Sequence, residues 1–264
     1  MLKLNNVFKN RVKDQLLGNK KMSAGWLQAS SPITAEIMAK SGFDILVIDM
    51  EHGPGDIMSL LHQLHALSGY EATPFVRVPW NDFVIIKRVL DAGAHGILVP
   101  YVNSAEQAKQ AVKACKYPPE GFRGIAPSPR AGGFGMNGKD YLEHANAQIS
   151  LFVAIETKEA VDNLPEILNV RGIDGIFIGP MDLSTSMGYF GNPQAYEVKE
   201  TISKIEKLVF QSDKVLATVA SNVHQAKNLY EKGYRIVVMM SDTTTLGEVA
   251  KNTVSEFNKI YPNH

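Results

Sequence analysis

The sequence contains one cysteine, Cys115, among 264 residues, so no disulfide can form within the chain. It has no run approaching the 18 apolar residues of a membrane-spanning helix, and no signal peptide is evident at its start. Neither sign of charge is in excess, because 27 basic residues balance 27 acidic ones. This balance removes the usual electrostatic argument for a nucleic-acid or membrane partner. Together these absences predict a cytoplasmic protein in a reducing compartment.

Eight short apolar runs alternate with helical patterns along the chain. Because the runs are continuously apolar, they predict parallel strands buried on both faces. Eight such units in about 240 residues predict an α/β fold, a (β/α)8 TIM barrel, as a single domain over residues 1–264. The expected strands span residues 22–27, 44–49, 73–77, 96–100, 151–155, 175–178, 215–219 and 236–240. The expected barrel helices span residues 32–41, 56–68, 82–92, 104–115, 158–168, 193–211, 222–232 and 244–260.

An extra N-terminal helix is expected before the first strand, over residues 5–17, where Phe8, Val12 and Leu16 repeat every four positions and Gly18 follows. An open, doubly wound sheet is the alternative fold. No Gly-x-Gly-x-x-Gly pattern follows the first strand and no Walker A motif is present, which argues against nucleotide binding.

Charged residues follow several expected strands at their C-terminal ends, where TIM barrels carry their active sites. The densest group is Asp-Met-Glu-His-Gly-Pro at residues 49–54. The third strand ends with Arg77, the fifth leads into Glu156, and the loop after the sixth contains Asp182. Taken alone, residues 49–54 also fit an acidic helix N-cap with a surface histidine. The repetition at other strand ends favours a site.

Two of these carboxylates suggest a metal site. Glu156 and Asp182 come from adjacent strands and can converge on one cation, and two carboxylates with open positions suit Mg²⁺ or Mn²⁺. A 2-oxo acid can chelate such an ion through its carboxylate and keto oxygens. The metal and Arg77 would then stabilise an enolate oxygen, and His52 would transfer the proton.

Three other features have simpler interpretations. The long connection at residues 117–137, which includes Arg123 and Arg130, is either an anion-binding lid or a plain surface excursion. His62 and His65 share a helix face without a third ligand nearby, and we interpret them as surface or packing residues. Cys115, late in a helical pattern, is interpreted as a buried structural thiol.

Several short motifs together resemble one enzyme family. They are Asp-Met-Glu-His-Gly-Pro at 49–54, Val-Arg at 76–77, Val-Leu-Asp-Ala-Gly-Ala at 89–94, Tyr-Pro-Pro at 117–119, Arg-Gly at 123–124, Ile-Glu-Thr-Lys at 155–158 and Gly-Ile-Asp-Gly-Ile-Phe-Ile-Gly-Pro-Met-Asp-Leu-Ser at 172–184. Over residues 22–257 the chain resembles the HpcH/HpaI aldolases, which are class II pyruvate aldolases.

The resemblance implies a divalent-metal-dependent aldehyde-lyase that reversibly cleaves a 4-hydroxy-2-oxo acid to pyruvate and an aldehyde. It implies Glu156 and Asp182 as ligands of Mg²⁺, Mn²⁺ or Co²⁺. It also implies His52 as a general base acting through a metal-bound water, and Arg77 as the group that stabilises the enolate oxygen.

The same resemblance implies supporting roles around the metal. Backbone groups of Met181 and Asp182 would hold the donor carboxylate. Asp49 and Glu51 would order the metal-bound waters.

The resemblance further implies an oligomer, a homohexamer built as a trimer of dimers. Asp91 of a neighbouring subunit would raise the basicity of His52. The sequence departs from the family at Ala154, because the family commonly has glutamine two residues before the metal-binding glutamate.

Three alternative functions remain open from the sequence. An acyl-CoA lyase similar to the citrate lyase β subunit or malyl-CoA lyase shares the Ile-Glu-Thr segment, but that branch typically lacks the Glu51–His52 pair. A non-catalytic barrel would leave the metal site unused. A Schiff-base aldolase needs a lysine inside the barrel, whereas Lys21 and Lys214 precede strands and Lys158 starts a helix.

Overall fold

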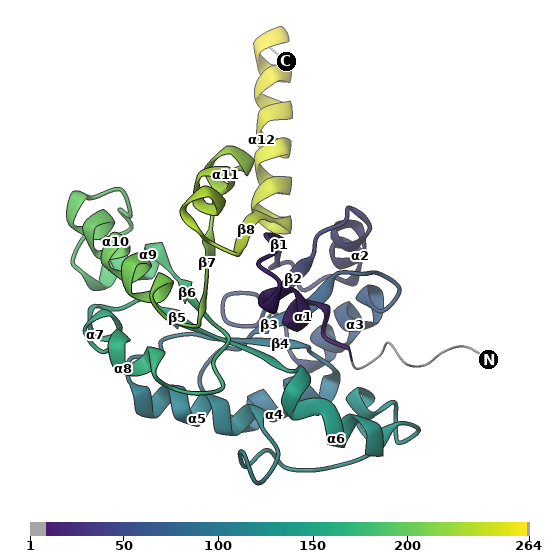
Figure 1. The fold of residues 1–264 in the computed structure, drawn as a ribbon. Coiled ribbons are helices and arrows are strands. Elements are labelled where there is room, and N and C mark those ends of the chain that lie inside the picture. The colour runs from purple at the N-terminus through teal and green to yellow at the C-terminus, as the bar shows by residue number, and fades with distance from the viewer. Residues whose placement is uncertain (1–8, 263–264) are drawn as a thin grey trace.

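The continuously apolar runs of the sequence form eight parallel strands that close into a barrel (Figure 1). The structure is a computed structural model and describes residues 9–262. Neighbouring strands pair in chain order, and the last strand pairs with the first. The strands are β1 (Met22–Leu27), β2 (Ile45–Asp49), β3 (Thr73–Arg77), β4 (Gly96–Val99), β5 (Ser150–Ile155), β6 (Gly175–Ile178), β7 (Val215–Val219) and β8 (Ile236–Ser241). The predicted (β/α)8 barrel is therefore confirmed.

Most helices connect the strands and pack around the outside of the barrel, whereas α1 precedes the first strand and α12 follows the last (Figure 1). They are α1 (Arg11–Leu17), α2 (Pro32–Lys40), α3 (Ile57–Leu67), α4 (Phe83–Ala92), α5 (Ala105–Cys115), α6 (Gly138–Gln148), α7 (Lys158–Asp162), α8 (Leu164–Leu168), α9 (Pro180–Ser186), α10 (Tyr196–Phe210), α11 (Val223–Lys232) and α12 (Asp242–Ile260), with a 3₁₀ turn at Arg130–Gly132. Two elements were not predicted, α6 and α9, and the helix expected over residues 158–168 is two helices.

Polar side chains fix where several helices begin. The carboxylate of Asp56 accepts hydrogen bonds from the backbone N–H groups of Met58 and Ser59 at the start of α3. Asp82 caps α4 and Ser104 caps α5 in the same way. These caps satisfy N–H groups that have no partner within the helix, so each strand-to-helix turn has one preferred geometry.

The N-terminal helix α1 covers the end of the barrel where the strands begin. Val12 is buried in the barrel interior with Met22 of β1 and Ile236 of β8. Asn10, which caps α1, donates from Nδ2 to the carbonyl of His95 at 2.8 Å. The extra helix is thus confirmed, although it begins at Arg11, and the predicted contribution of Phe8 lies outside the described residues.

The barrel interior is filled by side chains that alternate along the strands. The ring of Trp26 meets that of Phe177 edge-on, with centroids 5.9 Å apart. Ala154 belongs to this same interior cluster, whereas the next residue, Ile155, packs toward the helices. The alternation directs Glu156 inward, as the sequence predicted.

The C-terminal helix α12 projects from the barrel instead of lying along it (Figure 1). Of its 19 residues, only the first, Asp242, is buried. Large apolar side chains along it are exposed, among them Leu246, Val249, Phe257 and Ile260. A helix with an uncovered apolar stripe indicates a surface that packs against another molecule.

Candidate active site

Arg77 and Asp49 form a bidentate ion pair at the C-terminal ends of β3 and β2. The two residues are direct partners in the strand register. Arg77 donates from Nε to Asp49 Oδ1 at 2.9 Å and from Nη2 to Asp49 Oδ2 at 2.6 Å. Its third nitrogen, Nη1, lies 3.0 Å from Glu51 Oε2, and the guanidinium carbon lies 4.4 Å from the centre of the Trp26 ring. These contacts fix the plane of the guanidinium.

Asp49 is ionised in this arrangement. Burial alone raises the pKa of its carboxyl group, but the hydrogen bonds and charge of Arg77, with help from Gln28 and the backbone N–H of His52, outweigh burial and hold the pKa below its usual value. The turn that follows requires a glycine, since a Cβ on Gly53 would lie 2.2 Å from the carbonyl oxygen of Asp49.

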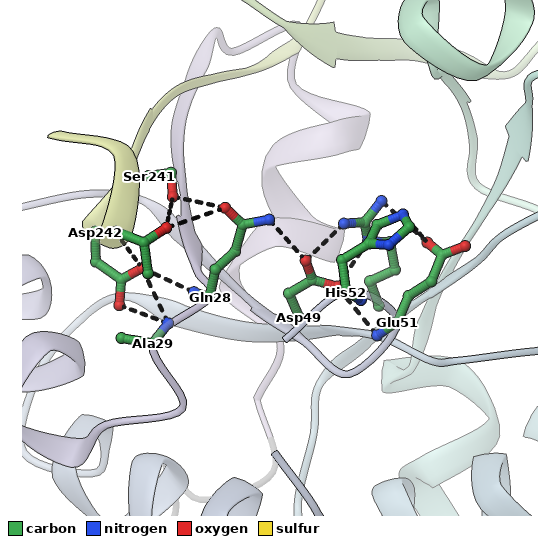
Figure 2. Close-up of polar contacts among 9 residues, drawn as sticks. Gln28, Ala29, Asp49, Glu51, His52, Ser241 and Asp242 are labelled. Carbon is green, nitrogen blue, oxygen red and sulfur yellow. Dashed lines mark hydrogen bonds and ion pairs between the residues drawn. The ribbon is translucent and has the colours of Figure 1, made fainter. Parts of the chain in front are cut away.

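Glu51 and His52 follow at the mouth of the barrel (Figure 2). Burial raises the pKa of Glu51, against the opposing charges of Arg77 and His52. The imidazole Nε2 of His52 lies 3.9 Å from Glu51 Oε2, and 58% of the histidine side chain is exposed. An exposed imidazole beside a carboxylate is placed to exchange protons with a ligand in the mouth.

Tyr101 bridges the two predicted metal ligands. Its backbone N–H donates to Glu156 Oε1 at 2.6 Å, and its hydroxyl donates to Asp182 Oδ1 at 3.3 Å. Tyr101 has a φ of 51°, in the left-handed region that non-glycine residues seldom adopt. This strained conformation, common at functional sites, lets one residue hold both carboxylates together.

Glu156 carries a large electrostatic perturbation. Burial, the main cause, and the nearby carboxylates of Glu51 and Asp182 raise its pKa to about 7, although the N–H of Tyr101 opposes the shift. Gly179 packs directly against this carboxylate, because a Cβ there would lie 2.5 Å from Glu156 Oε2. Glycine at this position leaves room for the carboxylate oxygen.

The donor set fits a hard divalent cation. Within residues 9–262, no three His, Cys, Asp or Glu side chains are arranged to hold a metal together. Glu156 and Asp182 would therefore supply two ligands, with water or substrate completing the shell, as is usual for Mg²⁺. The site also carries more negative than positive charge, since four carboxylates face one arginine. A cation at this position would relieve that repulsion.

Met181 and Asp182 lie in the first turn of α9, directly after β6. The side chain of Met181 is exposed. The sequence placed both residues in a loop, but the helical turn still leaves them at the C-terminal end of the barrel, beside Glu156.

Asp91 is the one predicted site residue that lies far from the others in the structure. It lies in the last turn of α4, near the start of β4, and so at the opposite end of the barrel from His52. There it accepts a hydrogen bond of 2.7 Å from Nη2 of Arg123. Within one chain Asp91 therefore does not accompany His52, and only a second chain could bring the two together.

Of the two interpretations of residues 117–137, the contacts of Arg123 and Arg130 contradict the anion-binding lid. Arg123 is buried between the rings of Tyr117 and Tyr141. Arg130 donates to the backbone carbonyls of Ala92 and Leu64. Both arginines bind residues near the C-terminal ends of α3 and α4, at the end of the barrel away from the site.

The other expectations for isolated residues hold. Cys115 is a buried free thiol, and burial raises its pKa to about 12. His62 and His65 are exposed on α3. The part of the chain that the structure describes has no helix long and apolar enough to cross a bilayer.

Sequence reasoning missed four polar residues around the site: Gln28, Tyr101, Ser241 and Asp242. Gln28 donates from Nε2 to Asp49 Oδ2 at 3.0 Å, and Ser241 donates to Gln28 Oε1 at 2.7 Å (Figure 2). Each of the four lies within two residues of the end of β1, β4 or β8. The strand-end rule that found Asp49 and Glu156 could also have found them.

The fold and the site together define a class. A parallel barrel with an arginine, a histidine and paired carboxylates at the C-terminal ends of its strands is an α/β-barrel lyase site. The family model described as HpcH/HpaI aldolase/citrate lyase matches residues 23–248. The chain belongs to this family.

Individual relatives agree with this assignment. A 4-hydroxy-2-oxo-heptane-1,7-dioate aldolase of Escherichia coli is 43% identical over 232 residues, covering 88% of each chain. The crystal structure of an HpcH/HpaI aldolase/citrate lyase family protein of Burkholderia cenocepacia superposes with a TM-score of 0.91 at 32% identity, over 95% of this chain and all of that one. The citrate lyase β subunit of M. tuberculosis, solved with oxaloacetate and magnesium, shares the fold alone, with a TM-score of 0.54 at 16% identity over 84% of this chain and 92% of that one.

Proposed function

We propose that this chain is a single-domain, divalent-metal-dependent aldolase that reversibly cleaves a 4-hydroxy-2-oxo acid to pyruvate and an aldehyde. The observation that carries the proposal is the pairing of Glu156 and Asp182 through Tyr101, beside an arginine whose plane is fixed. The curated relatives named as 4-hydroxy-2-oxo-heptane-1,7-dioate aldolases support this substrate class. The test is aldol addition of pyruvate to a panel of aldehydes, with and without a chelator.

The residues divide the chemistry among them. Glu156 and Asp182 would hold Mg²⁺, Mn²⁺ or Co²⁺, and the bound ion would polarise the keto oxygen of the substrate. His52 would take the proton from the C4 hydroxyl as the C3–C4 bond breaks and the aldehyde leaves. Arg77 would donate to the oxygen of the resulting enolate from hydrogens on its terminal nitrogens. The proton taken up by His52 would then be delivered to C3, which gives pyruvate and restores the neutral imidazole.

The alternative functions have less support. The acyl-CoA lyase branch is represented by the more distant fold match, and the Glu51–His52 pair stands at the mouth of this barrel. The lysines considered for a Schiff base are unsuited to it, because Lys21 and Lys158 are exposed and Lys214 pairs with Asp213 before β7.

Metal affinity should depend on pH through Glu156. Its pKa of about 7 means that the carboxyl group is mostly protonated at pH 6, and a cation must displace that proton. We expect Mn²⁺ to bind about tenfold more weakly at pH 6 than at pH 8, with proton release on binding below pH 7. Calorimetry in two buffers of different ionisation enthalpy measures both quantities. Equal affinity at the two pH values would contradict a ligand role for Glu156.

Ala154 should leave the donor pocket loose. It lies in the barrel interior, and alanine offers no hydrogen bond where the family commonly has glutamine. A bridging water in its place costs about 0–2 kcal/mol of immobilisation. We expect Ala154→Gln to lower the KM for pyruvate and to reject 2-oxobutyrate. Ala154→Met, of similar size, controls for filled volume and should reject 2-oxobutyrate without improving pyruvate binding. Unchanged donor preference in both variants would show that position 154 does not face the donor.

We also propose a homo-oligomer, a hexamer as the family resemblance implies. The projecting helix α12 supports association, because its exposed apolar side chains include Leu246, Val249 and Phe257. The family resemblance pairs Asp91 with His52. Because the two residues lie at opposite ends of the same barrel, that pairing requires a second chain.

The oligomer should assemble complete sites from two chains. Mixing Asp91→Asn with His52→Ala protein under reassembly should restore some activity, because a mixed assembly contains sites with both native residues. Leu246→Glu/Phe257→Glu should shift the sedimentation coefficient toward smaller species. A fully active monomer would contradict both statements.

A further inference from the structure

Gln28 lies between Asp242, at the start of helix α12, and Asp49 (Figure 2). Asp49 in turn pairs with Arg77. Gln28 directly follows β1, whose neighbours in the closed barrel are β8 and β2. Its backbone N–H donates to Asp242 Oδ1 at 2.8 Å. Its side-chain amide reaches in two directions, because Oε1 accepts from the hydroxyl of Ser241 at 2.7 Å and Nε2 donates to Asp49 Oδ2 at 3.0 Å.

The two partners fix the orientation of the amide. The ionised carboxylate of Asp49 can only accept, so it requires the N–H₂ side of Gln28. The hydroxyl of Ser241 can donate to the carbonyl side. Flipping the amide would set two acceptor oxygens against each other, so Gln28 holds one orientation and adds a neutral donor to Asp49.

The orientation of the Asp49 carboxylate in turn fixes the orientation of the Arg77 guanidinium. Both carboxylate oxygens of Asp49 are used in the bidentate pair, so a rotation of the carboxylate would tilt the guanidinium off the Trp26 ring. Each terminal nitrogen of Arg77 carries a second hydrogen that can point at a substrate oxygen. The direction of those hydrogens depends on Asp49, and Gln28 is the side chain that braces Asp49 from β1.

We propose that Gln28 is a positioning residue that acts through Asp49 to aim Arg77 at the enolate oxygen. This inference rests on the proposed aldolase function. Ser241, the last residue of β8 and the N-cap of α12, in turn holds Gln28. Asp242 secures the same turn by accepting hydrogen bonds from the backbone of Gln28 and Ala29. The start of α12 is thereby connected to the site.

Gln28→Met tests the proposal, because methionine has similar length and makes no comparable hydrogen bonds. We expect kcat for aldol cleavage to fall about 10- to 100-fold, as for other residues that orient an active-site group from behind. KM should change much less, because the interaction strengthens as the enolate oxygen develops charge. Ser241→Ala leaves the bond from Gln28 to Asp49 and should lower kcat by a smaller factor.

Thr34→Val is the matched control. The hydroxyl of Thr34 donates to Asp242 Oδ2 at 2.6 Å in the same network, but it does not touch the amide of Gln28. The variant should lower Tm about as much as Gln28→Met does and keep wild-type kcat. Equal loss of kcat in the two variants would overturn the positioning role.

A double-mutant cycle separates positioning from general damage. If Gln28 acts through Arg77, then Gln28→Met should lower kcat little further in an Arg77→Lys background. Additive losses would overturn the proposal. A wild-type protein inactive on every 4-hydroxy-2-oxo acid would instead refute the aldolase function. In that case the crystal structure of Gln28→Met decides, and a guanidinium that stays over Trp26 would refute the positioning role.

Discussion

Replacing Glu156 by Gln or Asp182 by Asn should abolish measurable aldol cleavage, with a loss of about 10³-fold or more. Each change keeps the shape of the side chain and removes one of the two charges available to a cation. Lewis-acid stabilisation is worth several kcal/mol, and about 4 kcal/mol corresponds to 10³ in rate. Steady-state kinetics and Mn²⁺ binding should fail together.

Glu206→Gln is the control for burying a neutral amide in place of a carboxylate. Glu206 is buried and accepts hydrogen bonds from Tyr234 and Lys232, away from the site. The variant should be less stable and still metal-dependent. Exhaustive chelation of the wild-type protein should reproduce the Glu156→Gln defect, and full turnover without metal would refute a metal-dependent mechanism.

His52→Ala should slow aldol cleavage about 10²- to 10⁴-fold, the usual range for loss of a general base. Oxaloacetate decarboxylation should fall much less. Loss of carbon dioxide forms the enolate without removing a proton from a hydroxyl, whereas aldol cleavage must deprotonate the C4 hydroxyl. Parallel assays of the two reactions on one protein preparation measure the difference.

Because His52 is exposed, its replacement should change the reaction rate without lowering the stability of the fold. Because 58% of its side chain is exposed and, among residues 9–262, its one short-range charged partner is Glu51 at 3.9 Å, truncation removes little packing. Tm should therefore remain close to that of the wild type. Equal loss of both reactions would mean that His52 organises the site instead of transferring a proton.

The sequence predicted the barrel and most of the strand-end residues because both depend on local patterns. Continuous apolar runs marked all eight strands, and charged residues directly after them marked Asp49, Arg77 and Glu156. The N-cap of α5 was also predicted correctly, since Ser104 caps this helix. These signals are carried by neighbours in the chain.

What the sequence did not predict depends on weak patterns or on distant contacts. Helix α6 buries only Gly138 and Ala145, so it shows little apolar periodicity. The expected helix over 158–168 breaks at Asn163, since Pro165 cannot donate the backbone hydrogen bond that a continuous helix needs. The burial of Arg123 beside Asp91 joins positions 32 residues apart, which no local pattern reveals.

Helix α1 closes the end of the barrel where the strands begin, and this closure bears on the kinetics. Val12 fills the barrel where the strands begin, and Lys13 ties the helix there by donating to the carbonyl of Ile149 and pairing with Asp174. Side chains also fill the barrel interior, so substrates and products enter and leave at the opposite end, where the strands end. In the proposed reaction, the half of the substrate that becomes pyruvate would lie against the buried Glu156, and the aldehyde half would lie nearer the exposed His52. For the proposed reaction we therefore expect ordered release, with the aldehyde leaving first and pyruvate last, and we expect excess pyruvate to inhibit by occupying the site that the substrate must enter.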